Sequence, residues 1–109
     1  MASALPHQPP VDHAPEEETD VVVGQDSRTD VLQVLSSHTA QRILKTLKGD
    51  PKTASEIAEY VDRSVQNVSY HLDRLCGAEL IEPTATWYSE KGREMTVYAL
   101  TAERLVVRF

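Results

Sequence analysis

Apolar residues between positions 29 and 77 recur with the spacing of amphipathic helices. A short first segment begins near Thr29, and three longer segments follow it. Their apolar positions are, in order, Val31, Leu32, Val34 and Leu35; Ala40, Ile43, Leu44 and Leu47; Ala54, Ile57, Ala58 and Val61; and Val65, Val68, Leu72 and Leu75. Because residues three and four apart share one side of a helix, we expect the last three sets to form inward faces.

Capping residues fix where the predicted helices begin and end. Hydroxyl side chains that can accept a backbone N–H stand at three starts: Ser37, Thr53 and Ser64. Glu56 follows Thr53 at the spacing of a capping box, in which the two residues bond each other's backbone. Gly49, followed by Pro51, ends the second helix, and Gly77 ends the fourth. The third and fourth helices are therefore joined by only a tight turn.

Strand-like patterns follow the last helix. Beyond Leu80 and Ile81, residues 86–89 and 94–100 are rich in aromatic and β-branched side chains, and the turn residues 90–93 separate them. This arrangement predicts a β-hairpin. Residues 105–109 are apolar except for Arg108, and they end on Phe109. They fit a further strand, a cover for a partner, or the cut end of a longer chain.

The first 28 residues differ from the rest in composition. They hold four of the six prolines, an acidic run and few large apolar side chains. Such a segment buries too little surface to offset the entropy of ordering, so we expect residues 1–28 to be disordered and residues 29–109 to form one domain. The run Val21–Val23 is the exception, and it could add a strand or dock on a partner.

The order of elements predicts a fold of the α+β class, a winged helix-turn-helix. About four helices are followed by a β-hairpin wing. In this arrangement the third helix braces the fourth, whose outer face enters the major groove of double-stranded DNA. The sequence therefore predicts a recognition helix at about 64–76 and a wing at about 86–98 that contacts the backbone or the minor groove.

Polar side chains occupy the outward positions of that helix and the tip of the hairpin. The candidate DNA-binding residues are Ser64, Gln66, Asn67, Ser69, Tyr70, His71 and Arg74 on the helix, and Lys91 and Arg93 at the tip. Gln66 and Asn67 suit adenine, Arg74 suits guanine, and Ser64 at the helix start suits a phosphate. The alternative is that these residues have no role in binding and form a solvated helix face and an ordinary turn. Glu90 and Glu94 weaken the positive potential of that turn.

Net charge argues against a nucleic-acid partner at first sight. The formal charge is −6, whereas phosphate binding normally needs a basic surface. However, six carboxylates and one arginine lie in residues 1–29, so the remaining residues sum to −1. A near-neutral domain keeps a second function class open: a winged helix that serves as a protein–protein interaction scaffold without binding DNA.

The recognition-helix region resembles the arsenical-resistance-repressor-like (ArsR-like) regulators. That family's V-S-x-H-L-x-x-L helix and the apolar pair after it are matched by Val68, Ser69, His71, Leu72, Leu75 and then Leu80–Ile81. The hairpin at 87–95 is similar to the wing of such regulators in halophilic archaea. The resemblance implies a transcription regulator that forms a homodimer through its first helix and C-terminal end and reads an inverted repeat. The N-terminus has no basic start followed by an apolar stretch, so it does not read as a secretory signal and we expect a cytoplasmic protein.

Other functions lack their residues in this sequence. Cys76 is the only cysteine, so the paired cysteines of metal-sensing relatives are absent, and we expect no metal or cofactor. No phosphate loop, serine elbow or metal-ligand motif indicates an enzyme. No apolar run is long enough to span a membrane. We expect structural roles for two further residues: Cys76 packs in the core, and His38 stands at a helix start.

Overall fold

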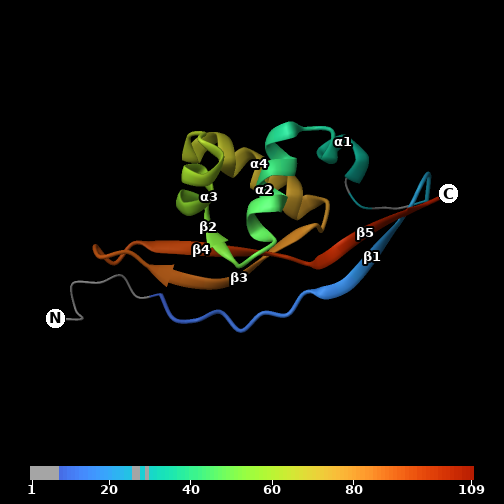
Figure 1. The fold of residues 1–109 in the computed structure, drawn as a ribbon. Helices are drawn as coiled ribbons and strands as arrows, with labels where there is room; N and C mark the ends of the chain where they lie inside the picture. The colour runs from blue at the N-terminus through green and yellow to red at the C-terminus, as the bar shows by residue number, and fades with distance from the viewer. Residues whose placement is uncertain (1–7, 26–27, 29) are drawn as a thin grey trace.

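The computed structural model describes residues 8–25, 28 and 30–109. Four helices pack on one side of a β-sheet (Figure 1). They are α1 (Val31–Leu35), α2 (His38–Leu47), α3 (Ala54–Val61) and α4 (Val65–Gly77), and the sheet contains β2 (Lys52–Thr53), β3 (Ile81–Tyr88) and β4 (Glu94–Leu100). The chain is an α+β winged helix-turn-helix, as the sequence predicts.

Each predicted helix start has its cap. The Ser37 hydroxyl accepts the Ala40 N–H at 3.2 Å, and the Ser64 hydroxyl accepts the Asn67 N–H at 3.0 Å. At α3 the Thr53 hydroxyl accepts the Glu56 N–H, while the Glu56 carboxylate accepts the Thr53 N–H at 2.9 Å. The capping box is therefore complete. These bonds satisfy N–H groups that the first turn of a helix leaves without partners.

The inward faces of α2, α3 and α4 meet in one core. Its fully buried side chains include Ile43, Ile57, Leu72, Leu75 and Val97, which come from three helices and the sheet. The assignment of Val65 to the inward face was wrong. Its side chain is 46% exposed, because the first turn of α4 lies before the part of the helix that packs on the core.

The wing is a three-stranded antiparallel sheet in the order β2-β4-β3. The predicted hairpin is present, but β3 begins at Ile81 rather than near residue 86. Its turn closes through the Ser89 N–H, which donates to the Arg93 carbonyl at 2.9 Å, and Gly92 takes the positive φ of 78° that glycine tolerates. The short strand β2, which the sequence analysis did not predict, joins β4 directly before α3.

Part of the N-terminal segment forms a strand, contrary to the prediction of disorder over residues 1–28. Strand β1 (Glu16–Val22) pairs in parallel with β5 (Ala102–Arg108), and together they form a two-stranded ribbon. Val21 is buried in the core, and the Arg108 guanidinium lies 3.2 Å from the Asp20 carboxylate. The sequence left open whether Val21–Val23 and residues 105–109 form strands. In the structure Val21 and Val22 belong to β1, and residues 105–108 belong to β5. Burial of Val21 and backbone pairing with β5 offset the entropy of ordering this segment.

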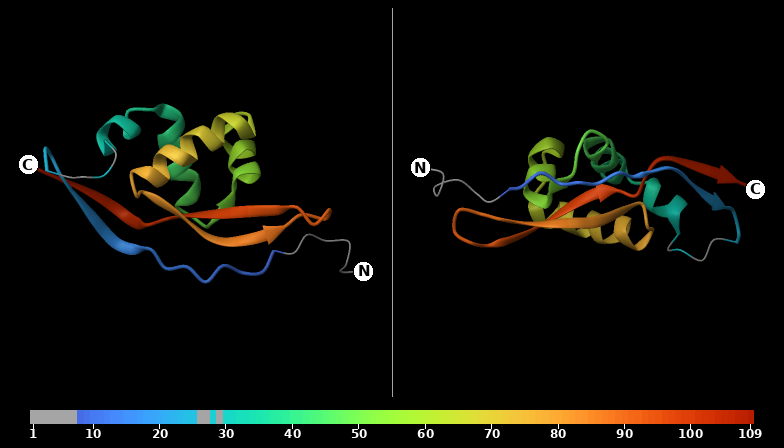
Figure 2. Two further views of the ribbon diagram at one scale, coloured as in Figure 1. Left: turned by 180° about the vertical axis from the view of Figure 1, so that it is seen from behind. Right: turned by 90° about the horizontal axis from the view of Figure 1, so that it is seen from below.

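Residues 8–15 continue from the ribbon along the face of the sheet that the helices leave open (Figure 2). The Trp87 Nε1–H donates to the Pro9 carbonyl at 3.0 Å. His13 Nε2 lies 2.9 Å from the Leu100 carbonyl oxygen. The helices therefore cover one face of the wing and the N-terminal segment crosses the other. Residues 1–7 of the predicted disordered segment lie outside the described residues.

Candidate nucleic-acid interface

The turn between α3 and α4 holds the two helices in a fixed relationship. Asp62 adopts the left-handed conformation, with φ 55° and ψ 51°, and the Arg63 N–H donates to the Ala58 carbonyl at 3.2 Å. Aspartate is one of the few non-glycine residues that visits this conformation readily. The chain then leaves α3 and begins α4 within a few residues, which is the compact connection that a helix-turn-helix requires.

The predicted recognition residues share the outer face of α4. Ser64, Gln66 and Asn67 are exposed, and Tyr70 is 57% exposed. Ser69, His71 and Arg74 are half-buried. The structure thus brings all seven helix positions to one element, where the buried stripe of Val68, Leu72 and Leu75 turns them away from the core.

Three of these side chains contact one another. Arg74 Nη1 lies 3.4 Å from Tyr70 Oη, and the guanidinium carbon is 5.8 Å from the centre of the Tyr70 ring. The rings of Tyr70 and His71 meet edge-on at 5.2 Å. Partial burial and the nearby Arg74 charge lower the pKa of His71, so its imidazole is neutral at pH 7 and can both donate and accept a hydrogen bond.

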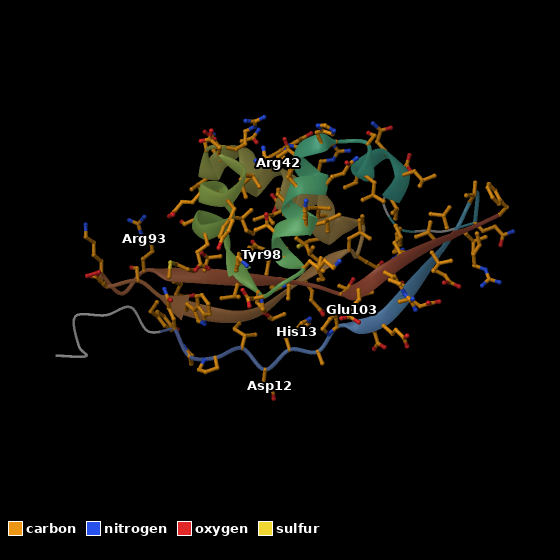
Figure 3. All side chains as sticks on the ribbon, viewed as in Figure 1. Asp12, His13, Arg42, Arg93, Tyr98 and Glu103 are labelled. Carbon is orange, nitrogen blue, oxygen red and sulfur yellow. The ribbon has the colours of Figure 1, made fainter. Side chains whose placement is uncertain are left out.

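Lys91 and Arg93 lie on the hairpin turn, and both are exposed. Figure 3 shows Arg93 at the end of the wing, far from the ribbon of β1 and β5. Glu90 and Glu94 beside them are exposed as well, so the tip carries charges of both signs.

Two further exposed residues stand at the start of α4, beside the residues that the sequence predicts to bind DNA. Arg63 stands in the turn directly before Ser64 and is exposed, with its Nη1 bonded to the Asp62 carbonyl at 3.3 Å. A basic residue beside the cap of a recognition helix is a readable signal for a phosphate contact. Val65 was assigned to the core on its spacing, and only its observed exposure adds it to this surface.

Cys76 and the potential metal ligands of the described residues lie apart from one another. Cys76 is half-buried against the core, and burial together with the Asp73 carboxylate raises the pKa of its thiol. Within residues 8–25, 28 and 30–109, no three His, Cys, Asp or Glu side chains come together in a way that could hold a metal ion. None of the helices in these ranges has the length and apolar content to cross a membrane.

Known proteins match this chain mainly over its helices. The sequence model of a helix-turn-helix domain family matches residues 27–84. The transcriptional repressor SdpR of Bacillus subtilis (strain 168) is 41% identical over 51 residues, which are 47% of this chain and 57% of that protein. The chain therefore matches little more than half of that relative's length.

Two solved mycobacterial structures share the fold. The M. tuberculosis protein Rv0081 superposes with a TM-score of 0.53 at 22% identity, over 65% of this chain and 66% of its own. The homodimeric winged helix-turn-helix DNA-binding domain of Mb0332 from Mycobacterium bovis, a possible ArsR-family transcriptional regulator, also gives a TM-score of 0.53 at 21% identity. Here the superposition covers 74% of this chain and 77% of that domain.

Proposed function

This chain belongs to the helix-turn-helix domain family, and from that premise we propose that it binds double-stranded DNA and regulates transcription as an ArsR-like regulator. The observation that carries the proposal is the outer face of α4: its side chains are mainly polar and exposed or half-buried, and the helix packs against the capped bracing helix α3. A major groove admits one α-helix, and base edges are read by side chains of this kind. The DNA-binding unit comprises residues 29–109 together with β1, which pairs with β5 and buries Val21 in the core.

In the proposed complex, residues 64–76 lie in the major groove. Gln66 and Asn67 pair with adenine, and Arg74 pairs with guanine. Tyr70, His71 and Ser69 contact neighbouring base edges or phosphates, and Val65 contacts a thymine methyl group. Ser64 and Arg63 hold a phosphate at the start of α4, where the helix dipole favours an anion. Lys91 and Arg93 of the wing contact the backbone or the minor groove.

A homodimer is the second part of the proposal. The M. bovis domain is homodimeric, and an inverted-repeat site requires two copies of the reading helix. In this chain Leu32 of α1 is 47% exposed and Val107 of β5 is 42% exposed. These apolar side chains lie on the first helix and near the C-terminal end, where a second copy would cover them.

The acidic composition agrees with action in a saline cytoplasm. There, counterion release contributes little to binding, so base contacts carry more of the affinity than phosphate contacts do. The similarity of the wing to halophilic archaeal regulators is part of this proposal. The near-neutral domain charge also favours a protein-binding scaffold, which would expose an apolar patch. Val65 and Tyr70 are exposed on α4, but the same helix also presents amides and a guanidinium, which suit base edges better.

A selection from a random duplex library at moderate and at multimolar KCl tests the function. We expect an inverted repeat to be enriched at both concentrations by the natural chain and not by the R74A variant. The R42A variant, which removes an exposed arginine from α2, is the matched control and should enrich the same repeat. If the natural chain retains no DNA at either concentration, the scaffold replaces the proposal. If the selection enriches a single half-site instead of an inverted repeat, the dimer is contradicted but DNA binding is not.

A further inference from the structure

A groove separates the helices from the beginning of β5, away from α4's outer face and from the wing tip. Its volume is about 490 Å³, within the range of small-molecule sites. Five leucines line it: Leu35 of α1, Leu44 of α2, Leu80, Leu100 of β4 and Leu105 of β5. All but Leu80 are only partly buried. The groove therefore offers an apolar surface that the chain itself leaves incompletely covered.

Two cations stand at this apolar surface. Lys45 and Lys48, at the C-terminal end of α2, both line the groove. Among the described residues, neither ammonium group has a carboxylate within ion-pair distance, whereas the Lys52 ammonium lies 3.2 Å from the Asp50 carboxylate. Both lysines are exposed, so their ammonium groups are accessible beside the leucines.

The other charged groups of the groove lie on β1 and β5. The Arg104 guanidinium, which also lines it, is held by the Glu18 carboxylate at 2.9 Å and by the Glu17 carboxylate at 3.3 Å. Glu103 is the one carboxylate among the lining side chains. The positive charge without a carboxylate partner is therefore that of Lys45 and Lys48, so an anionic head group would be attracted to the α2 side.

We propose that this groove binds an amphipathic carboxylate, with its aliphatic chain on the leucines and its carboxylate at Lys45 and Lys48. Burial of the chain supplies the hydrophobic part of the affinity, and charge-assisted hydrogen bonds from the two ammonium groups fix its direction. A neutral molecule of the same length gains only the first contribution. Leu32 and Val107, which we propose that a second copy covers, do not line the groove. The ligand and the second copy would therefore contact different side chains.

Such a ligand would contact the helices and the strands at the same time. The groove is bounded by α1 and α2 on one side and by β4 and β5 on the other. α2 packs against both α3 and α4 through Ile43 and its neighbours in the core. An occupant would therefore fix the ribbon of β1 and β5 against the helices that brace the proposed reading helix.

The test uses the full chain without DNA, so its outcome is independent of the proposed DNA binding. Sodium decanoate is titrated below its micelle-forming concentration and followed by calorimetry and by amide NMR shifts. We expect saturable binding at one site per chain, with the largest shifts in residues 44–48 and 100–105. Decanol, which lacks the carboxylate, should bind more weakly by about tenfold or more, the effect of losing a charged hydrogen bond.

Matched variants distinguish binding in the groove from nonspecific binding of decanoate. The K45Q/K48Q variant should lose about tenfold or more in decanoate affinity and keep its thermal midpoint. The R42Q variant is the control, because Arg42 is an exposed cation of the same helix that does not line the groove (Figure 3). An equal loss in R42Q, equal binding of decanol, or no saturable binding overturns the proposal. If decanoate fails to bind and L44R turns a dimer into a monomer in sedimentation, a second copy occupies the groove instead.

Discussion

Arg74 Nη1 lies 3.4 Å from Tyr70 Oη, one helical turn earlier on the outer face of α4. The guanidinium also lies 5.8 Å from the centre of the same ring. Both contacts restrict the rotamers of a long, flexible side chain at the surface that we propose reads DNA. An arginine that is already oriented loses less entropy when it forms a bidentate bond with a guanine.

Replacing Arg74 with alanine should weaken specific DNA binding by about 1–3 kcal/mol, the contribution of one good base contact. The thermal midpoint should hardly change, because Arg74 contributes little to the core. Replacing Tyr70 with phenylalanine keeps the ring and removes the hydroxyl, so it should cost less than R74A. Fluorescence anisotropy with the selected operator measures both. Normal binding by R74A would show that the reading face is misassigned.

Leu72 and Val65, two positions of the predicted apolar stripe of α4, should respond differently to truncation. Leu72 is 1% exposed, so L72A should lower the free energy of unfolding by about 2–5 kcal/mol through the cavity that it leaves. Val65 is 46% exposed, and V65A should change that free energy by no more than about 0.5 kcal/mol. Urea denaturation followed by circular dichroism compares the two. A large loss of stability in V65A would place this residue back in the core.

The contribution of the capping box at the start of α3 to the free energy of unfolding should be measurable with single substitutions. T53A removes the hydroxyl that accepts the Glu56 N–H, and it should cost about 0.5–2 kcal/mol of stability. S55A alters a neighbouring exposed hydroxyl and serves as the control. Chemical denaturation of both variants provides the comparison. Equal midpoints for the two would mean that the box does not stabilise the folded chain.

The N-terminal strand should depend on the burial of Val21. V21D places a charge at a position that is 4% exposed, whereas V23D places the same charge at a position that is 41% exposed. Burying an unpaired carboxylate is costly, so V21D should detach β1 from β5. Hydrogen exchange of residues 16–22 should become fast in V21D and stay slow in V23D. Fast exchange of these amides in the natural chain would restore the prediction of disorder.

Cys76 should react slowly with alkylating agents. Burial and the Asp73 carboxylate raise the pKa of its thiol, so less of the reactive thiolate is present near neutral pH than for a free cysteine. The rate of iodoacetamide labelling should therefore rise at a higher pH in the folded chain than in urea-unfolded chain. Mass spectrometry follows both rates. A folded chain that labels as fast as the unfolded one at pH 7 would contradict this environment.

The order of helices and the hairpin were predictable because their signals are local. A capping hydroxyl acts on an N–H within the next turn, so Ser37, Thr53 and Ser64 could be identified without knowledge of the fold. The spacing of apolar residues likewise assigned most of the inward faces. The outward residues of α4 followed by subtraction, although their contact with DNA stays a prediction.

Positions at the ends of elements were less predictable. Val65 has the spacing of the buried stripe, but periodicity does not say how far along a helix its packing partners extend. Its exposure depends on where the remaining core residues lie in space. The start of β3 at Ile81 was missed for a similar reason, because pairing with Leu100 of β4 defines that end of the strand.

By itself, the sequence determined the helices, their caps, the wing turn and the class of fold, since each of these depends on interactions within a few residues. Only the tertiary structure decided that Glu16–Val22 becomes a strand. Its partner β5 lies at the opposite end of the chain, and Glu16 pairs with Ala102 across nearly the whole sequence. An acidic, proline-containing segment carries no local signal for such a pairing. It is ordered because a distant strand and a core site for Val21 are brought beside it when the rest of the chain folds.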